Sequence, residues 1–266
     1  MHPHSIKSNY TDTLARKRRA KVFVGMIIFA VATIGMSGGL IYLFFFSKFF
    51  DLRSIALNGL TSLNSEQVNN IINLNLDSKI FHYIPRKNNI LSLDTAEIRN
   101  NLLAKFPILK SVDIKRKYPH ELVFNFQERT AVGIWCFGGD NCQYFDSDGN
   151  TWGIAIKSSG FLMLSVDDKR NRDDNKIDVE YFKAIKIFID HPKDLHFILS
   201  DIIIDQASFR DFKVNSSEGY PILFSLDSNI AEQIRILGIF LQNKEKESEF
   251  KPQYIDLRID GRVYYK

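Results

Sequence analysis

Residues 22–47 read VFVGMIIFAVATIGMSGGLIYLFFFS, and no charged residue occurs between Lys21 and Lys48. A helix needs roughly 20 apolar residues to cross the hydrocarbon core of a bilayer, so this run is long enough. A helix also satisfies its own backbone hydrogen bonds in lipid. The sequence therefore predicts an uncleaved transmembrane helix at 22–47. A cleaved signal peptide would have a shorter apolar region ending at a small-residue cleavage site.

The charges that flank this helix predict its orientation. Six Lys or Arg against one Asp give residues 1–21 a net charge of +5, and few cations follow the apolar run. Positively charged flanks stay on the cytoplasmic side of a membrane. We therefore expect residues 1–21 to form a cytoplasmic basic tail, disordered at its start. Everything after about residue 50 should lie outside the cytoplasmic membrane.

The exterior part offers no basic surface for nucleic acid. The whole chain carries +4, so the residues after the tail carry −1. The only two cysteines, Cys136 and Cys142, lie in this part, with a turn-forming segment between them. Two interpretations stay open, a disulfide across a hairpin or two reduced side chains near a turn. No metal site is expected, because two cysteines without a nearby His are too few ligands.

Residues 52–128 show the periodicity of a compact domain. Alternation predicts strands at 53–60, 109–117 and 122–128. Apolar spacing predicts one helix capped by Asn64 or Ser65 and a second capped by Asp94. A polar loop at 75–89 separates the two helices. Two helices packed on a three-stranded sheet would bury the apolar faces of both layers.

Residues 129–266 predict a mainly β domain with helices. Strands are expected at 130–137, 143–145, 151–157, 161–166, 201–205, 211–215 and 221–226, with helices at 179–189 and 229–242. Ser228 is the expected cap of the second helix. Two closing strands, 254–258 and 262–266, flank a turn. The predicted fold class is α+β: one N-terminal transmembrane helix, a β-α-α-β-β domain, and a mainly β domain with a C-terminal edge strand.

Two stretches are similar to a known family. Residues 106–122, FPILKSVDIKRKYPHEL, followed by Glu128-Arg129, resemble a POTRA domain. This type of POTRA domain follows a single membrane span in the FtsQ/DivIB family of bacterial cell-division proteins. The ending YIDLRIDGRVY, residues 254–264, resembles the end of that family's second domain. The resemblance implies a POTRA domain at 52–128 and an FtsQ-type β domain at 129–266.

The sequence does not predict an enzyme. The exterior histidines are scattered, and the chain lacks the GxSxG, HExxH, P-loop and GxGxxG patterns. We therefore expect no catalytic residues, no cofactor and no small-molecule substrate.

Partner binding is the better physical explanation for the C-terminal segment. A strand at a sheet edge presents unpaired N–H and C=O groups, to which a partner can add a strand. The resemblance implies that division proteins of the FtsB/DivIC and FtsL type bind this end. The candidate partner-binding residues are Tyr254, Asp256, Arg258, Ile259, Asp260, Gly261 and Val263. The alternative is that Tyr254, Ile255 and Leu257 belong partly to the core and that Asp256 and Arg258 form a solvated ion pair.

Together with this resemblance, the sequence predicts a non-enzymatic, membrane-anchored scaffold that, as the resemblance implies, recruits or bridges division partners at the septum. The rival class is a POTRA-containing component of protein export or outer-membrane assembly. Such a component would normally contain several POTRA repeats or a following barrel of long alternating strands.

Overall fold

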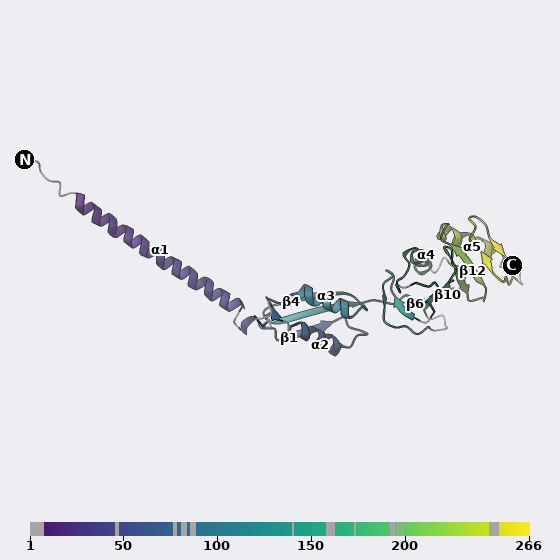
Figure 1. Ribbon diagram of the computed structural model, residues 1–266, viewed down its shortest axis with the longest axis horizontal. Coiled ribbons are helices and arrows are strands. Elements are labelled where there is room, and N and C mark those ends of the chain that lie inside the picture. Colours follow the sequence, from purple (N-terminus) through teal and green to yellow (C-terminus); the bar gives the residue numbers. More distant parts are fainter. Residues whose placement is uncertain are drawn as a thin grey trace, which may run out of the picture. The chain divides into compact units, whose positions relative to one another are not determined.

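The computed structural model describes residues 8–45, 48–76, 79–80, 84–85, 89–139, 141–157, 163–172, 174–191, 195, 197, 199–244 and 250–266. The chain divides into two compact units. The first unit comprises Met1–Leu102 and Ser111–Phe126, and the second comprises Leu103–Lys110 and Gln127–Lys266. Figure 1 labels the main elements along the chain.

The apolar run lies in α1, Ser8–Phe45, which a short 3₁₀ turn, η1, Lys48–Phe50, follows. Among the described helices, α1 is the one that is long and apolar enough to cross a membrane. The helix begins inside the basic tail, so residues 8–21 are helical, which the sequence did not predict. Alanine, lysine and arginine are good helix formers, and they continue the helix begun by the apolar run. Residues 1–7, 46 and 47 lie outside the described part.

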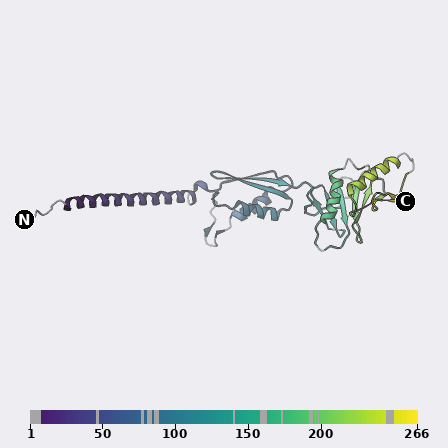
Figure 2. The same cartoon turned by 90° about the horizontal axis from the view of Figure 1, so that it is seen from above.

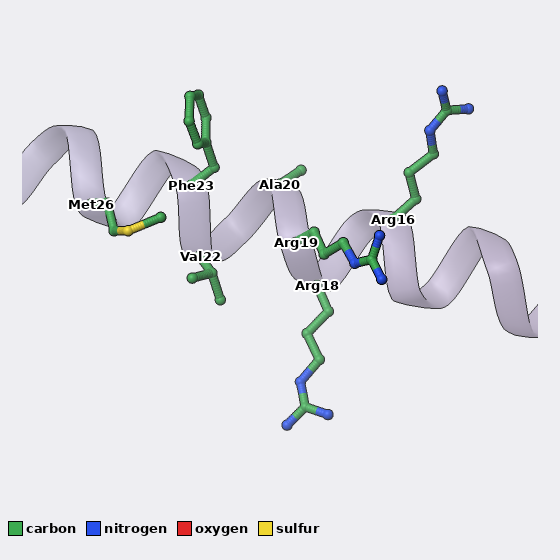
Figure 3. Close-up of a pocket in the computed structure, with 7 residues that line it drawn as sticks. All are labelled: Arg16, Arg18, Arg19, Ala20, Val22, Phe23 and Met26. Carbon is green, nitrogen blue, oxygen red and sulfur yellow. The ribbon is translucent and has the colours of Figure 1, made fainter.

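Cations surround α1 where its apolar surface starts. Figure 3 shows Arg16, Arg18 and Arg19 pointing to different sides of the helix. Successive residues of an α-helix are about 100° apart, so neighbouring arginines must diverge in this way. The charged end of the helix is therefore basic around its circumference rather than along one stripe.

The first unit contains the strand-helix-helix-strand-strand order that the sequence predicted. Its elements are β1 Ser54–Asn58, α2 Ser65–Leu76, β2 Lys79–Ile80, β3 Ile84–Pro85, α3 Thr95–Lys105, β4 Leu109–Lys117 and β5 Glu121–Glu128. The three-stranded sheet has the order β1-β5-β4, with β1 parallel to β5. Figure 2 shows α2 and α3 on one side of these strands. Their buried residues, such as Ile72 and Leu102, form a core with Phe124 and other inward residues of the sheet.

The sequence predicted three helix caps, and the structure confirms two of them. Asn64 Oδ1 accepts the backbone N–H of Glu66 at 2.8 Å, which makes Asn64 the cap of α2. Asp94 Oδ1 accepts the N–H of Ala96 at 2.9 Å at the start of α3. The third prediction, Ser228, is wrong by one residue. The cap of α5 is Asn229, whose Oδ1 accepts the N–H of Glu232 at 3.2 Å, because α5 begins at residue 230.

The second unit contains the remaining strands and two helices. Their bounds are β6 Gly133–Phe137, β7 Asn141–Phe145, β8 Thr151–Trp152, β9 Leu164–Asp168, α4 Val179–Asp190, β10 Leu199–Ile204, β11 Asp211–Ser216, β12 Pro221–Ser225, α5 Ile230–Lys244, β13 Ile255–Asp256 and β14 Tyr264–Tyr265. The described strands form one sheet in the order β14-β13-β12-β11-β10-β9-β6-β7-β8. The order places β14 at one edge and β8 at the other.

Two crossovers place both helices of this unit on one face of the sheet. The segments β9-α4-β10 and β12-α5-β13 each join parallel neighbours. Strand β11 is antiparallel to both β10 and β12, so β9 and β12 run in the same direction. Both crossovers also step toward the β14 edge. Crossovers of this kind are almost always right-handed, and two that step the same way must cover the same face.

The helix-covered face holds the main core of the second unit. Residues from α4 and α5, including Phe188 and Leu237, pack against inward residues of the strands, including Trp135 and Phe224. The opposite face has a smaller apolar cluster made of Ile134, Cys136, Cys142 and Ala155. Cys136 and Cys142 face each other across β6 and β7 and are joined by a disulfide, with their Sγ atoms 2.00 Å apart.

A buried ion pair fixes the turn between β7 and β8. Arg129 Nη1 lies 2.6 Å from Asp146 Oδ2, and the two side chains are only 18% and 5% exposed. Arg129 Nε donates to the carbonyl of Pro107 at 3.1 Å. Asp146 Oδ1 accepts the backbone N–H groups of Asp148 and Asn150, both at 2.9 Å. Arg129, from the Glu128-Arg129 motif, therefore joins the segments around Pro107 and Asp146 in this unit.

Asp146 is held as a carboxylate. Burial alone raises the pKa of Asp146, but hydrogen bonds from the Asn150 backbone and the Arg129 guanidinium outweigh it. The pKa therefore lies below the ordinary value. A depressed pKa means that the carboxylate stabilises the fold fully above its unfolded pKa. This stabilisation is lost as the pH falls through the folded pKa.

Asp146→Ala is expected to lower the free energy of unfolding of the second unit by about 3 kcal/mol, because it leaves a largely buried guanidinium unpaired. The variant should also lose part of the acid sensitivity that the wild type shows below about pH 4. Urea unfolding followed by tryptophan fluorescence measures both effects, since Trp135 and Trp152 lie in this unit.

The control is Asp148→Ala, whose exposed ion pair with Lys110 should be worth about 1 kcal/mol or less. Equal unfolding curves for Asp146→Ala and the wild type would show that the buried ion pair does not hold the turn.

Candidate partner-binding edge

The C-terminal edge of the large sheet is a hairpin of β13 and β14. The two strands are antiparallel, with Ile255 opposite Tyr265 and Asp256 opposite Tyr264. Strand β13 also runs parallel to β12, so it connects the hairpin to the rest of the sheet. In the described part of the chain no strand pairs with the outer side of β14. The predicted C-terminal edge strand is therefore confirmed.

The hydrogen bonds of the hairpin show which backbone groups face outward. Lys266 N–H donates to the carbonyl of Tyr254 at 3.4 Å, and Gln253 N–H donates to the carbonyl of Lys266. In an antiparallel ladder, residues that bond to the partner strand alternate with residues whose N–H and C=O point away from it. Because Lys266 bonds inward, the backbone groups of Tyr265 and Val263 point toward the free edge.

The predicted site residues all lie in this one hairpin. Tyr254 precedes β13, Asp256 lies in it, and Val263 precedes β14. Ile259, Asp260 and Gly261 form the turn, which the N–H of Arg262 closes on the carbonyl of Ile259 at 3.1 Å. Gly261 has φ of +68°, a conformation that residues with a side chain rarely adopt. These three turn residues are thus outside the strand ladder.

Arg258 is bound inside its own unit. Its Nε and Nη2 donate to the two carboxylate oxygens of Asp256 at 3.0 and 2.8 Å. Its Nη1 donates to Asp211 Oδ2 at 3.0 Å, which ties the hairpin to the start of β11. Both contacts raise the pKa of Arg258, with the hydrogen bond to Asp256 the largest cause. Burial alone raises the pKa of Asp256, but the bonds from Arg258 outweigh it, so its pKa lies below the ordinary value.

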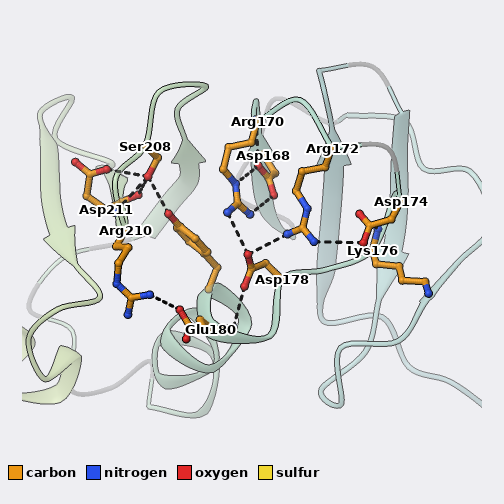
Figure 4. A network of polar contacts seen from close by, with 11 residues as sticks. Asp168, Arg170, Arg172, Asp174, Lys176, Asp178, Glu180, Ser208, Arg210 and Asp211 are labelled. Carbon is orange, nitrogen blue, oxygen red and sulfur yellow. Dashed lines mark hydrogen bonds and ion pairs between the residues drawn. The ribbon is translucent and has the colours of Figure 1, made fainter.

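Asp211 links Arg258 to a longer chain of polar contacts. Asp211 Oδ1 lies 2.8 Å from Ser208 Oγ, and Ser208 Oγ lies 2.8 Å from the hydroxyl of Tyr181 on α4. The Arg170 guanidinium stacks 4.1 Å from the centre of the Tyr181 ring and pairs with the buried Asp168 at 2.7 Å. Figure 4 shows this chain running from Asp211 to Arg170. The C-terminal hairpin is thereby connected to the helix layer.

Aromatic rings cover the helix-facing side of the edge. The Tyr265 ring lies 5.2 Å from the Phe240 ring on α5 and 5.6 Å from the Phe250 ring, between ring centres. Lys244 Nζ lies 5.2 Å from the centre of the Tyr265 ring. Tyr264, on the opposite face, is about half-exposed, as is Tyr265.

The list of candidate residues from the sequence missed Tyr264 and Tyr265. The sequence predicted a strand at 262–266, and its two adjacent tyrosines were the available signal. Which of the two closing strands forms the edge depends on the pairing of β13 with β12, and this pairing joins segments that α5 separates.

Comparisons with known proteins identify the type of domain that the first unit contains. Residues 50–129 match the family described as POTRA domain, FtsQ-type. The cell division protein FtsQ of Streptomyces coelicolor is 28% identical over 109 residues, which cover 41% of this chain and 38% of that protein. The chain thus contains an FtsQ-type POTRA domain and is distantly homologous to cell division protein FtsQ, while the match spans well under half of that relative.

Arg258→Ala is expected to loosen the hairpin, because it removes all contacts between the Arg258 side chain and Asp256 and Asp211. Backbone amides of residues 253–266 should exchange with deuterium at least tenfold faster, a loss of about 1.4 kcal/mol of local stability. Hydrogen exchange with mass spectrometry on the detergent-solubilised chain measures this.

Arg262→Ala is the matched control, since the Arg262 side chain donates to the Tyr264 hydroxyl at 3.3 Å on the exposed surface. If both alanine variants exchange at the wild-type rate, Arg258 does not position the hairpin.

Proposed function

We propose that this chain, an FtsQ-type POTRA protein, is a non-enzymatic scaffold of the bacterial division complex. It captures division partners by adding a partner strand to the free side of β14. The observation that carries this proposal is the outward-facing backbone of Val263 and Tyr265 at the end of the sheet order. Its distant homology to a cell division protein supports the cellular process.

The N-terminal helix supplies the location. A single apolar helix with cations around its first part acts as an anchor in the cytoplasmic membrane. The positive flank keeps residues 1–21 in the cytoplasm and leaves the rest of the chain outside it. The working boundaries are a span at 22–47, a POTRA domain at 52–128 and a β domain at 129–266. The anchored chain concentrates at the division septum.

Strand addition also explains how the edge selects its partner. Main-chain hydrogen bonds to the N–H and C=O groups of Val263 and Tyr265 provide affinity that does not depend on sequence. Alternate side chains of the added strand face either Tyr264 on the open face or Tyr265 and its aromatic neighbours on the helix face. Both surfaces suit apolar and aromatic side chains. The partners are division proteins of the FtsB/DivIC and FtsL type.

In this proposal Arg258 has an indirect part. Its guanidinium is already bonded to Asp256 and Asp211, so it holds the hairpin in place. Ile259, Asp260 and Gly261 set the turn and thereby the register of β14 against β13. The residues that meet the partner are then Val263 and those of β14.

Tyr265→Pro tests the proposal, because proline removes the outward N–H donor that an added strand would use. Partner proteins of the FtsB/DivIC and FtsL type from the same genome are co-expressed with the full chain and co-purified from membranes. The proline variant should retain at least tenfold less partner than the wild type, equivalent to about 1.4 kcal/mol.

The matched control is Tyr265→Val, which also removes the ring but keeps the N–H group. Valine should retain most of the partner. If proline and valine variants retain equal amounts, main-chain pairing at β14 is not the mode of binding. Hydrogen exchange of β12 and β13 in both variants checks that the sheet itself is intact.

A further inference from the structure

The POTRA domain is bonded to the end of α1 as well as linked to it by the chain. Asn89 is buried, and its Nδ2 donates to the carbonyl of Phe44, near the end of α1, at 2.7 Å. The Ile90 N–H donates to the carbonyl of Phe50 at 2.9 Å. The Phe44 and Phe50 rings stack with their centres 5.4 Å apart. All of these residues belong to the first unit, so the end of the helix and the start of the domain are held together.

The place of Phe44 in the helix sets the depth of this junction in a bilayer. The helical part of the apolar run, residues 22–45, is about 36 Å long, because each residue of an α-helix adds about 1.5 Å. This is slightly more than the hydrocarbon core of roughly 30 Å. Phe44 then lies about 16 Å from the middle of the run, at the boundary between hydrocarbon and headgroups. Because the Asn89 amide contacts Phe44, the adjoining end of the POTRA domain lies in the headgroup layer, which is roughly 5–8 Å thick.

The turn between β4 and β5 lies at this same end of the domain. The N–H groups of Arg53 and Ser54 are 2.9 and 3.3 Å from the carbonyl oxygen of His120 in the turn. Strands β1 and β5 start from this point and run parallel, with Ser54 opposite Glu121. Both strands therefore lead away from the junction. The turn lies beside the segment that leaves α1, at the end of the domain nearest the membrane.

This end of the domain carries exposed aromatic and cationic side chains. Phe49 is 58% exposed, and Tyr118 in the turn is 57% exposed. Exposed cations accompany both rings, namely Lys48, Arg53 and Lys117. Aromatic rings favour the interface between membrane and water, and cations near an anionic membrane are attracted to its lipids. The five side chains, which we call the anchor-proximal surface, therefore have the chemistry that a headgroup layer requires.

The acidic side chains near this surface leave most of its cations available. Glu121 pairs with Lys117 at 2.9 Å, but the Lys117 side chain is 70% exposed and such a pair is weak. Asp51 is partly buried. In the described part of the chain neither Lys48 nor Arg53 has an acidic partner. At least two cations of the anchor-proximal surface can therefore bind an anionic ligand.

We propose that the anchor-proximal surface docks on phospholipid headgroups in the extracytoplasmic leaflet of the membrane that holds α1. Phe49 and Tyr118 lie among the headgroups, while Lys48, Arg53 and Lys117 bind lipid phosphates. This inference rests on the proposed membrane anchor. A domain that is both bonded to the helix end and docked on the leaflet cannot swing about the anchor. Its remaining surfaces are then presented to the division complex in one orientation.

Depth-dependent fluorescence quenching tests this, with the full chain in vesicles that contain phosphatidylglycerol. The two native cysteines are joined in a disulfide, so an added cysteine can be labelled selectively. A label at Tyr118→Cys should be quenched at least threefold more by a headgroup-attached quencher than a label at Glu66→Cys. Glu66 is exposed at the start of α2, which the chain reaches from the other end of β1.

Removing charge from the surface should undock it. Arg53→Gln combined with Lys117→Gln should reduce quenching of the label at residue 118 at least threefold, because each cation near an anionic surface strengthens binding roughly fivefold. The matched control is Lys105→Gln combined with Lys110→Gln. It removes the same charge from exposed positions at the end of α3 and at the other end of β4 from Lys117, and it should leave quenching unchanged.

The proposal is overturned if the label at residue 118 is quenched no more than the label at residue 66. It is also overturned if the two glutamine pairs behave alike. A third label, at Ile34→Cys in the middle of the apolar run, separates this inference from the proposed anchor. If an acyl-chain quencher reaches residue 34 while the label at residue 118 stays unquenched, the anchor stands and the docking surface is wrong. If residue 34 is not quenched, the anchor itself is wrong and the docking surface falls with it.

Discussion

The common direction of β9 and β12 is the constraint on which the second unit depends. Each of these strands starts a right-handed crossover that steps toward the β14 edge, so α4 and α5 must cover the same face. Their apolar stripes then complete one core with that face. The other face carries only a small apolar cluster beside the disulfide. A sheet covered in this way leaves its two end strands available for pairing.

The two edges are built differently. The β14 edge is held by a web of charge-assisted hydrogen bonds from Arg258 through Asp211 toward α4, and an aromatic group flanks it. The β8 edge is held by the disulfide cluster and presents bare isoleucines. At an open sheet edge main-chain pairing does not depend on sequence, so the side chains beside the edge determine which strand can join.

Local periodicity made the first unit predictable. Its strands alternate with period 2, its helices have side chains such as Asp94 that bond to their first free N–H groups, and its connections are mostly short. These signals are all contained within a few residues. The helical part of the basic tail was missed because its polar sequence has no apolar stripe, and it continues a helix that the apolar run begins. The cap of α5 was misplaced by one residue because Ser228 and Asn229 have equivalent capping chemistry.

The sequence by itself determined the apolar helix, the order of elements in the first unit, and the hairpin that contains Tyr254 to Val263. Only the tertiary structure decided that β9 lies between β6 and β10, that β14 rather than β13 is the edge, and that Arg258 is bonded inward. Each of these depends on pairing between segments far apart in the chain. The residues of a strand specify that it will pair, but the neighbour it pairs with is set by how the whole sheet buries its apolar face.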